Sequence, residues 1–258
     1  MHMKYVRFKT ADGAVSNGIL ADGIVRKIHG EIWEEWKDAH REYPLEEVTL
    51  LAPVCPGKIV GVGANYRSFL DEKKKPYPLI PRIFLKPPTS VIGSGEPIIC
   101  PASDHLIQFE GELGVVIGKH CSQVGKAEAM AAVCGYTCLN DLTDRTMLEE
   151  DGIWTRGKGQ DTFAPIGPCI SDEVNLESDV IKTRVNGQIR QWKELTDMYF
   201  SVPELISFIS ENMTLLPGDI IATGTPAGAG QLNIGDVIEV EVGSIGILKN
   251  TMVGRTPV

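Results

Sequence analysis

The stretch from Phe109 to Gly118 constrains this chain most, because it combines an apolar strand pattern with two closely spaced carboxylates. Side chains alternate between the two faces of a β-strand, so Glu110 and Glu112 project from the same face at one end of it. The opposite face carries residues typical of a core, namely Gly111, Leu113, Val115 and Ile117. Like charges this close repel each other unless they are exposed, protonated or neutralised by a cation. An exposed acidic strand end and a cation site are equally compatible with this stretch taken alone.

A third carboxylate follows a second strand-like run. Val133–Leu139 is apolar and leads directly into Asn140 and Asp141. A carboxylate at the end of a buried strand can present a hard oxygen ligand. Three carboxylates without paired His or Cys residues nearby suit Mg²⁺ or Mn²⁺ better than Zn²⁺, because these ions prefer oxygen ligands. Three protein ligands would leave about three octahedral positions for water or a chelating substrate.

Composition excludes several classes of function. The 258 residues include 25 Lys and Arg against 34 Asp and Glu, for a net charge of −9. Such a chain lacks the basic surface that nucleic acids and anionic membranes require, so we expect neither partner. No apolar run approaches the roughly 20 residues of a membrane span, and no signal-peptide pattern is visible. The six cysteines form no Cys-x-x-Cys pair, which favours free thiols in a reduced, cytoplasmic protein.

Two domains are predicted: residues 1–52 form a small N-terminal domain, and residues 53–258 form the main domain. Short β-like runs in the small domain are separated by the turn-forming pairs Asp12-Gly13, Asn17-Gly18 and Asp22-Gly23. Glu31–Arg41 has helical character, with two Trp residues on one side of a charged stretch. The prolines of Leu51–Gly57 indicate a linker.

The main domain is expected to be mostly β. Its strand-like runs cover residues 96–100, 109–118, 133–141, 180–190, 218–223, 235–242 and 245–250. Helices are expected at Lys126–Val133 and at Val202–Asn212, the second with Ser201 and Glu204 as a capping box. The strands are too numerous, and the helices between them too few, for a doubly wound parallel sheet. The predicted class is therefore α+β with strands predominating.

Six stretches of the main domain give the chain a resemblance to the fumarylacetoacetate hydrolase superfamily. They occur in the family's order and cover about residues 58–250. Each is weak alone, but together they are specific. They are Gly61–Tyr66, Phe84–Pro87, Phe109–Gly118, Gly135–Asp141, Thr155–Lys158 with Asp161–Pro165, and Pro217–Pro226.

The resemblance implies a fold, a cofactor and an assembly. The fold would be a mixed β-sandwich roll with a small N-terminal domain, and the protein would be a homodimer. Mg²⁺ or Mn²⁺ would be held by Glu110, Glu112 and Asp141. Family substrates are small 2-oxo acids, whose carboxylate and 2-oxo oxygens can chelate the metal, and the ion would then stabilise an enolate as it forms.

The resemblance also assigns roles around that metal. Lys158 matches the active-site lysine, and Arg145 matches an arginine that handles substrate charge. Lys86, Thr225 and Tyr66 match positions that line the substrate pocket. A lysine desolvated beside a cation would have a lowered pKa and could donate a proton. From the residues alone, a Lys158 paired with one of the carboxylates is the simpler interpretation.

One position departs from the hydrolytic members of the superfamily. These typically carry a His a few residues after Asn-Tyr, paired with a Glu, to activate water. Here Phe69 holds the His position, although Glu72 is present as a candidate catalytic residue. A carboxylate alone is a poorer base at neutral pH than a His–Glu dyad. His105, five residues before Glu110, could approach the site but is more simply interpreted as a surface turn residue.

The missing His favours chemistry that needs only an enolate and a proton shuttle. We therefore expect tautomerisation, double-bond isomerisation or loss of CO₂, and the run Asn65–Asp71 resembles the branch that acts on 2-hydroxyhepta-2,4-diene-1,7-dioate. The alternative is a C–C bond hydrolase of acylpyruvate or fumarylpyruvate type. A third possibility, from another class, is a non-catalytic binder of 2-oxo acids. The presence of Lys158 counts against the binder, because binding alone does not need it.

Overall fold

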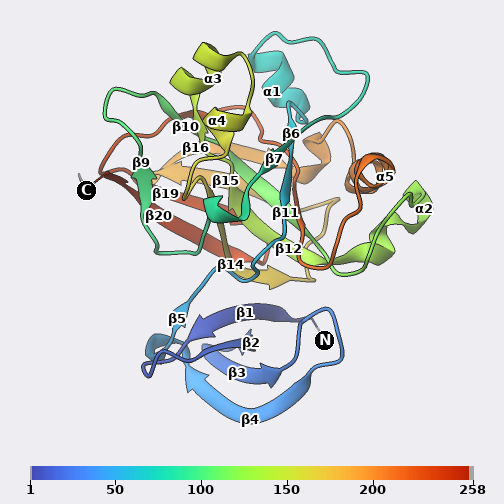
Figure 1. The fold of residues 1–258 in the computed structure, drawn as a ribbon, viewed down its shortest axis with the longest axis vertical. Coiled ribbons are helices and arrows are strands. Elements are labelled where there is room, and N and C mark those ends of the chain that lie inside the picture. The colour runs from blue at the N-terminus through green and yellow to red at the C-terminus, as the bar shows by residue number, and fades with distance from the viewer. Residues whose placement is uncertain (1, 256–258) are drawn as a thin grey trace.

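The protein is described by a computed structural model that covers residues 2–255. Strands predominate over helices within this range, which confirms the predicted mostly β class (Figure 1). The helices are α1 (Arg67–Glu72), α2 (Lys126–Ala129), α3 (Arg145–Asp151), α4 (Thr155–Lys158) and α5 (Val202–Asn212). Short 3-10 turns are η1 (Leu45–Glu47), η2 (Pro88–Ser90), η3 (Met130–Ala132) and η4 (Leu195–Asp197).

The strands form three sheets among the described residues. The largest has the order β4-β3-β2-β1-β14-β12-β11-β17-β6-β7, with β5 beside β1 and β8 beside β14. Its strands are β1 (Lys4–Lys9), β2 (Val15–Ala21), β3 (Ile24–His29), β4 (Lys37–Pro44), β5 (Thr49–Leu50), β6 (Ile59–Gly63), β7 (Arg82–Lys86), β8 (Val91–Ile92), β11 (Gly111–Ile117), β12 (Val133–Asn140), β14 (Ala164–Ser171) and β17 (Ile220–Ala222). A second sheet has the order β16-β15-β19-β20-β9, from β9 (Ile98–Cys100), β15 (Val180–Val185), β16 (Gln188–Glu194), β19 (Val237–Val242) and β20 (Gly246–Gly254). The third, β13-β10-β18, joins β10 (Ile107–Phe109), β13 (Thr143–Asp144) and β18 (Gly230–Gln231).

The N-terminal strands β1–β4 lie together at one end of the molecule (Figure 1). They form an antiparallel meander, and β1 continues into the main sheet by pairing with β14. The helix predicted over Glu31–Arg41 is wrong, because residues 37–44 form β4 instead. Trp33 and Trp36 are partly buried against the core of the neighbouring strands, so their spacing reflects packing rather than a helical face.

Strand β11 is the centre of the main domain. It pairs antiparallel with β12 on one side and with β17 on the other, and all seven of its residues are buried. The core around it includes Leu113, Val115 and Ile117, each with no exposed surface. The burial of β11 means that a charged side chain at its start enters the protein interior.

The helices decorate this β framework. Helix α5 runs over Val202–Asn212 as predicted, and its capping box is present, because Glu204 Oε2 accepts hydrogen bonds from the backbone N and Oγ of Ser201 at 3.0 and 2.8 Å. Helix α2 ends at Ala129, earlier than predicted, and β12 begins at Val133. The sequence patterns missed α1, α3 and α4, which are short and lie in the upper part of Figure 1, away from β1–β4.

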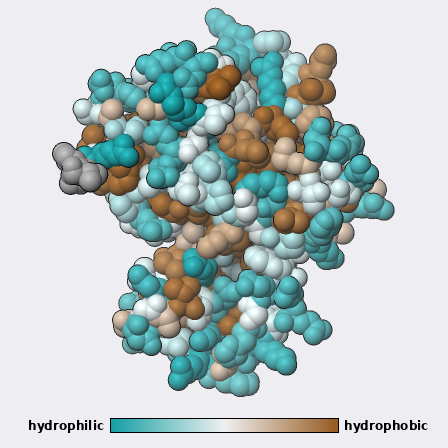
Figure 2. Space-filling view, viewed as in Figure 1, coloured by the Kyte–Doolittle hydropathy of each residue, from teal (hydrophilic) through white to brown (hydrophobic). Residues whose placement is uncertain are grey.

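The outer surface mixes polar and apolar residues. Figure 2 shows hydrophilic residues over most of one face, with a hydrophobic area in the region of β7. Leu85 of β7 and Ile153 are 50% and 62% exposed, and Leu79, in the loop before β7, is almost fully exposed. Within residues 2–255, no helix has both the length and the apolar character needed to cross a membrane.

Candidate metal centre and substrate pocket

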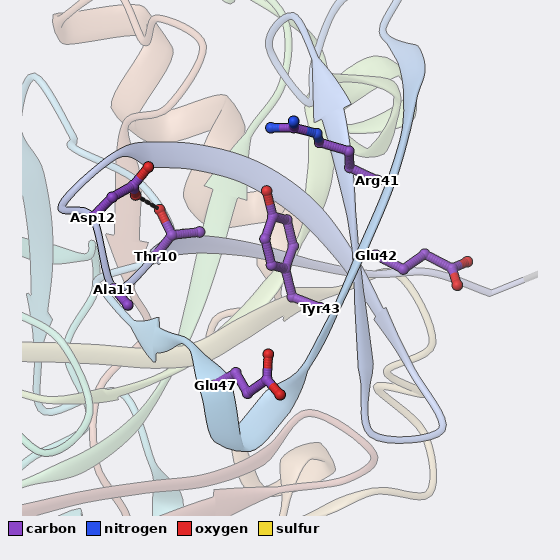
Figure 3. Close-up of a pocket in the computed structure, with 7 residues that line it drawn as sticks. All are labelled: Thr10, Ala11, Asp12, Arg41, Glu42, Tyr43 and Glu47. Carbon is purple, nitrogen blue, oxygen red and sulfur yellow. Dashed lines mark hydrogen bonds between the residues drawn. The ribbon is translucent and has the colours of Figure 1, made fainter.

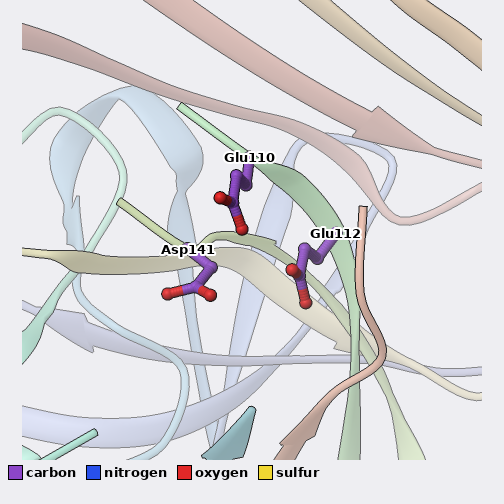
Figure 4. A group of neighbouring side chains, drawn as sticks. All are labelled: Glu110, Glu112 and Asp141. Carbon is purple, nitrogen blue, oxygen red and sulfur yellow. The ribbon is translucent and has the colours of Figure 1, made fainter. Parts of the chain in front are cut away.

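Three carboxylates converge where β11 and β12 lie side by side. Glu110 immediately precedes β11, Glu112 is its second residue, and Asp141 immediately follows β12. The antiparallel register places Gly111 opposite Asn140, which brings the start of one strand to the end of the other. One oxygen atom from each carboxylate lies within 4.8 Å of the others (Figure 4). The structure thus brings together the three side chains predicted as metal ligands.

Neighbouring loops hold two of these carboxylates in place. The backbone N–H of Gly224 donates to Glu112 Oε2 at 2.8 Å, and Thr143 Oγ1 donates to Glu110 Oε1 at 3.2 Å. Gly224 has a positive φ of 95°, and a Cβ at this position would lie 2.9 Å from the Cβ of Asn65. Only glycine adopts this conformation readily, so the residue type at 224 allows the loop to approach Glu112 closely.

Two buried lysines pair with the carboxylates. Lys86 Nζ donates to Asp141 Oδ1 at 2.6 Å, and Lys158 Nζ donates to Asp141 Oδ2 at 2.5 Å and to Glu110 Oε2 at 2.8 Å. Burial lowers the pKa of Lys158, but the charges of Asp141 and Glu110 outweigh burial and raise that pKa above its usual value. A lowered pKa is expected for this lysine beside a bound cation, and it stays a prediction; facing the two carboxylates alone, the amine has a raised pKa.

The charges suit a cation at this place. Three carboxylates against two lysines leave 3 − 2 = 1 negative charge in a buried cluster. Glu112 is 2% exposed, and among the described residues it has no ion-pair partner. Burial and then the charges of Asp141 and Glu110 raise the pKa of Glu112 well above its usual value. A divalent cation would offset that penalty, and an all-oxygen ligand set fits Mg²⁺ or Mn²⁺.

A small pocket opens onto these carboxylates. It encloses about 100 Å³, well below the roughly 300 Å³ at which pockets for drug-sized ligands begin. Its walls are partly apolar, with Phe69, Leu148 and Trp154 on them. The remaining lining residues are Val62, Gly63, Ala64, Lys75, Arg82, Phe84, Glu110, Glu112, Thr143, Arg145, Lys158 and Thr225. A pocket of this size, with both apolar and charged lining residues, suits a small ligand.

Family models match almost the entire described chain. The model described as "Fumarylacetoacetate (FAA) hydrolase C-terminal" matches residues 58–253, and the model "Rv2993c-like, N-terminal" matches residues 3–53. The chain belongs to the fumarylacetoacetate hydrolase family. The resemblance drawn from the six sequence stretches is therefore confirmed.

Relatives of known structure or function include isomerases and hydrolases. The chain is 37% identical over 254 residues to the oxaloacetate tautomerase YisK of Bacillus subtilis, covering 90% of this chain and 84% of that protein. It superposes on the crystal structure of a 2-hydroxyhepta-2,4-diene-1,7-dioate isomerase from Mycobacterium marinum with a TM-score of 0.91 and 37% identity, covering 99% and 100% of the two chains. A maleylpyruvate hydrolase from Sphingobium sp. SYK-6, solved with manganese(II) and pyruvate, matches with a TM-score of 0.81 and 27% identity, covering 98% and 100%.

Two of the residues expected to meet substrate line the pocket. Arg145 lies there at the start of α3, with its guanidinium 2.9 Å from Glu149. Thr225 also lines the pocket, but its hydroxyl is already engaged, because Oγ1 donates to the carbonyl of Gly111 and accepts from Gln191 Nε2, both at 2.8 Å. Thr225 thus braces the strand between the two glutamates.

Lys86, Tyr66 and Glu72 were also expected at the site, but none of them lines the pocket. Lys86 is fully buried, and its ammonium donates to Asp141, to the carbonyl of Leu142 and to that of Lys158, which uses all three of its N–H groups. Lys86 therefore orients Asp141 rather than lining the substrate pocket. Tyr66 is fully buried and does not line the pocket.

Glu72 lies outside the pocket as well. It is exposed at the end of α1, where Oε1 accepts from the backbone N–H of Gly228 at 3.1 Å and Oε2 pairs with Lys73 at 2.9 Å. Phe69, which holds the position expected for a water-activating His, does line the pocket. Its ring offers no group that can accept a proton from water. The pocket side of α1 therefore carries an apolar ring where the family's hydrolytic members are expected to carry a base.

His105 has a defined partner. Its Nδ1 lies 2.6 Å from Oδ2 of the fully buried Asp144, whose other oxygen accepts from the backbone N–H of Met147 and caps α3. His105 does not line the pocket. It braces the helix that begins with Arg145, a contact that its position in the sequence did not reveal.

Sequence reasoning missed two cationic residues of the pocket. Lys75 lies in the segment after α1, and Arg82 begins β7. The run of three lysines at residues 73–75 was visible in the sequence, but lysine runs are usually solvated, so the pattern did not single out Lys75. Only the folded path of the loop brings it to the site.

A second hollow lies on the N-terminal strands (Figure 3). It is lined by Thr10, Ala11, Asp12, Arg41, Glu42, Tyr43 and Glu47. Thr10 Oγ1 and Asp12 are hydrogen-bonded to each other at 2.5 Å, which stabilises the turn between β1 and β2. The charged residues here are exposed or partly exposed, and they form no buried cluster like that of Glu112 and Asp141, so we assign this hollow no function.

Proposed function

We propose that this chain is a divalent-metal-dependent enzyme that isomerises or tautomerises a small 2-oxo or 2-hydroxy-dienoic acid, with or without loss of CO₂. One observation carries the proposal. The ammonium of Lys158 pairs with Glu110 and Asp141 at a pocket that Lys158 itself lines, and Phe69 lines the same pocket in the place of a water-activating base. The site therefore has a proton-carrying group and a cation-binding group, but the residue of α1 that lines the pocket is not a base for water.

The residues have separable roles in this reaction. A divalent cation on Glu110, Glu112 and Asp141 would act as a Lewis acid toward the 2-oxo group of a bound acid. Lys158 Nζ lies against Glu110 and Asp141. It carries a proton that it can pass to a substrate carbon or oxygen. The rings of Phe69 and Trp154 restrict the access of water to the reacting atoms.

The runner-up is hydrolysis of a C–C bond in an acylpyruvate or fumarylpyruvate. The likeness to a maleylpyruvate hydrolase supports this alternative. It requires a base that activates water, and Glu72 would have to leave Gly228 and Lys73 to provide it. A non-catalytic binder is the third alternative, and the placement of Lys158 argues against it.

Proton NMR in D₂O separates these reactions. Oxaloacetate, an acylpyruvate and 2-hydroxyhepta-2,4-diene-1,7-dioate are each incubated with the full chain and Mg²⁺, and then with EDTA. We expect Mg²⁺-dependent deuterium exchange or double-bond migration in at least one of them. A Glu112→Gln variant, which keeps the size of the side chain but removes the charge, should lose this activity.

The alternative outcomes are distinct. Metal-dependent cleavage of the acylpyruvate into two acids would contradict the isomerase proposal and favour the hydrolase. Binding without exchange, migration or cleavage would favour the non-catalytic binder. Equal exchange in Mg²⁺ and in EDTA would contradict the role of the carboxylate cluster.

The assembly and location also stay predictions. We propose that the protein is a homodimer, as the family resemblance implies, and that it is cytoplasmic, as the pattern of its cysteines suggests. The apolar, half-exposed edge strand β7 with Leu85 and the nearby Ile153 supports association through this region. Sedimentation velocity of the wild type and of Leu85→Lys tests it: a dimer that the substitution converts to a monomer is expected.

A further inference from the structure

The pocket is locally cationic in an acidic chain. Its charged lining residues are Lys75, Arg82, Arg145 and Lys158 against Glu110 and Glu112, which gives 4 − 2 = +2. The whole chain carries −9. A cationic pocket in an acidic protein concentrates anions at one place on its surface.

Two of these four cations are already paired. Lys158 lies against Glu110 and Asp141, and Arg145 lies against Glu149. Lys75 and Arg82 form no ion pair with any residue in the range 2–255. Their charges are thus available to a ligand that enters the pocket.

Both residues are held so that they face the pocket from different elements. The backbone N–H of Lys75 donates to the carbonyl of Leu70 at 2.9 Å, and its ammonium lies 5.6 Å from the centre of the Phe69 ring. Arg82 is the first residue of β7 and pairs with Gly63 of β6, so its backbone is fixed by the sheet. Phe69, which is unable to activate water, serves here as a platform for Lys75.

The lining residues of the pocket therefore differ in chemistry. The carboxylates Glu110 and Glu112 suit a cation and, through it, the 2-oxo acid group of a substrate. Lys75 and Arg82 are themselves exposed, which places them on the solvent side, and partly apolar walls such as Trp154 lie in the same pocket. An anionic group at the far end of a substrate would meet these two cations.

We propose that Lys75 and Arg82 bind a second, distal carboxylate of the substrate, so that the enzyme selects 2-oxo dicarboxylates over 2-oxo monocarboxylates. This inference rests on the proposed function for the placement of the 2-oxo acid end. Arginine can bind a carboxylate through two parallel N–H donors, and lysine adds a point charge. Both contacts are partly exposed to water, so we expect their joint effect to be moderate and to weaken with added salt.

A matched pair of ligands isolates the distal carboxylate. 2-Oxoglutarate and 2-oxopentanoate share a five-carbon chain and a 2-oxo acid group, and they differ only in the terminal carboxylate. Their binding to the Mn²⁺-loaded full chain is measured by isothermal titration calorimetry at two salt concentrations, with protein-free titrations as a correction for chelation. Wild type should bind the dicarboxylate about 10-fold more tightly at low salt.

Substitutions of Lys75 and Arg82 test whether these two residues cause the preference for the dicarboxylate. Lys75→Met and Arg82→Met should each reduce the ratio of the two dissociation constants about 3-fold, and the double variant should bring it close to one. Binding of 2-oxopentanoate should stay unchanged in all of them. Lys74→Met is the matched control, because Lys74 is an exposed neighbour that does not line the pocket, and it should keep the wild-type ratio.

Different results would overturn the second carboxylate site and the proposed enzyme activity. Equal binding of the two ligands by wild type, or a preference that survives the double variant, would overturn the second carboxylate site. A preference that depends on Lys75 and Arg82, in a protein that shows no metal-dependent turnover, would support the site and overturn the proposed enzyme activity. Failure of both ligands to bind would overturn both.

Discussion

The hydroxyl of Thr183 occupies the space beside the Cα of Gly111, and its Oγ1 lies 2.0 Å from the point where a Cβ at position 111 would stand. Gly111 separates Glu110 from Glu112 at the start of β11. Its lack of a side chain therefore lets the strand carrying both carboxylates lie against β15. A larger residue at this position would have to push the two strands apart.

Substitution of Gly111 by Ala should destabilise the protein and disturb the carboxylate cluster. We expect a loss of about 1–3 kcal/mol of unfolding free energy from overpacking, together with weaker Mn²⁺ binding. Urea unfolding and calorimetric titration measure the two effects. The double variant Gly111→Ala/Thr183→Ala should recover part of both, because it removes the atom that causes the closest contact. Equal stability of the Gly111→Ala variant and the wild type would contradict this account of the close contact.

The sequence patterns predicted that the three carboxylates lie together, but they did not predict which other residues line the pocket. Alternation along β11 places Glu110 and Glu112 on one face, and Asp141 ends the strand that pairs with it, so local patterns determine this cluster. The role of Lys86 depends on the pairing of β7 with β6, and that of Lys75 on the path of the segment after α1; no local pattern encodes how these segments reach the site. The same limit explains the error at Glu31–Arg41, where tertiary packing of Trp33 and Trp36 outweighed the helical pattern.

Lys158 shares its carboxylate partners with the proposed cation, which leads to opposite effects on binding and turnover. Lys158→Met should reduce turnover at least about 100-fold, because the proton-carrying group is lost. It should leave Mn²⁺ affinity unchanged or raise it by about 3- to 10-fold, because a positive charge next to Asp141 and Glu110 is removed.

Calorimetric titration with Mn²⁺ and the NMR assay measure these two quantities on the same preparations. Lys119→Met, a substitution of an exposed lysine that does not line the pocket, is the control and should change neither. Full turnover in the Lys158→Met variant would refute the role of this amine. Loss of Mn²⁺ binding in the same variant would instead indicate that the lysine is needed to assemble the cluster.

The cysteines should differ sharply in reactivity. All six are free, and Cys55 is exposed while Cys100, Cys121, Cys138 and Cys169 are buried. Burial raises the pKa of Cys134 to about 11 and that of Cys169 to about 12, which suppresses the reactive thiolate at neutral pH. Titration with a disulfide reagent should detect one fast-reacting thiol per native chain and six thiols in urea. Cys55→Ser should abolish the fast phase, and a fast phase of more than one thiol would contradict the burial of the others.

The capping box of α5 should make stability depend on pH in the acid range. Lys126 lies 2.8 Å from Glu204 Oε1, and this contact, followed by hydrogen bonds from Ser201, lowers the pKa of Glu204 to about 2 from its ordinary value of 4.5. A carboxyl whose folded pKa is depressed contributes stability above its unfolded pKa and loses that contribution as the pH falls toward the folded pKa. Because the side chain is 36% exposed, water screens the interaction, and we expect only about 0.5–1 kcal/mol at pH 7.

Glu204→Gln isolates this contribution, because Gln keeps the hydrogen bond to the Ser201 backbone but carries no charge. Urea unfolding of wild type and variant at pH 7, 4 and 3 should show a difference that is complete at pH 7 and shrinks between pH 4.5 and 2. Lys126→Met should reduce the same difference at pH 7, since it removes the cation that faces the carboxylate. A difference between wild type and Glu204→Gln that stays constant from pH 7 to 3 would show that the charge of Glu204 does not stabilise the helix.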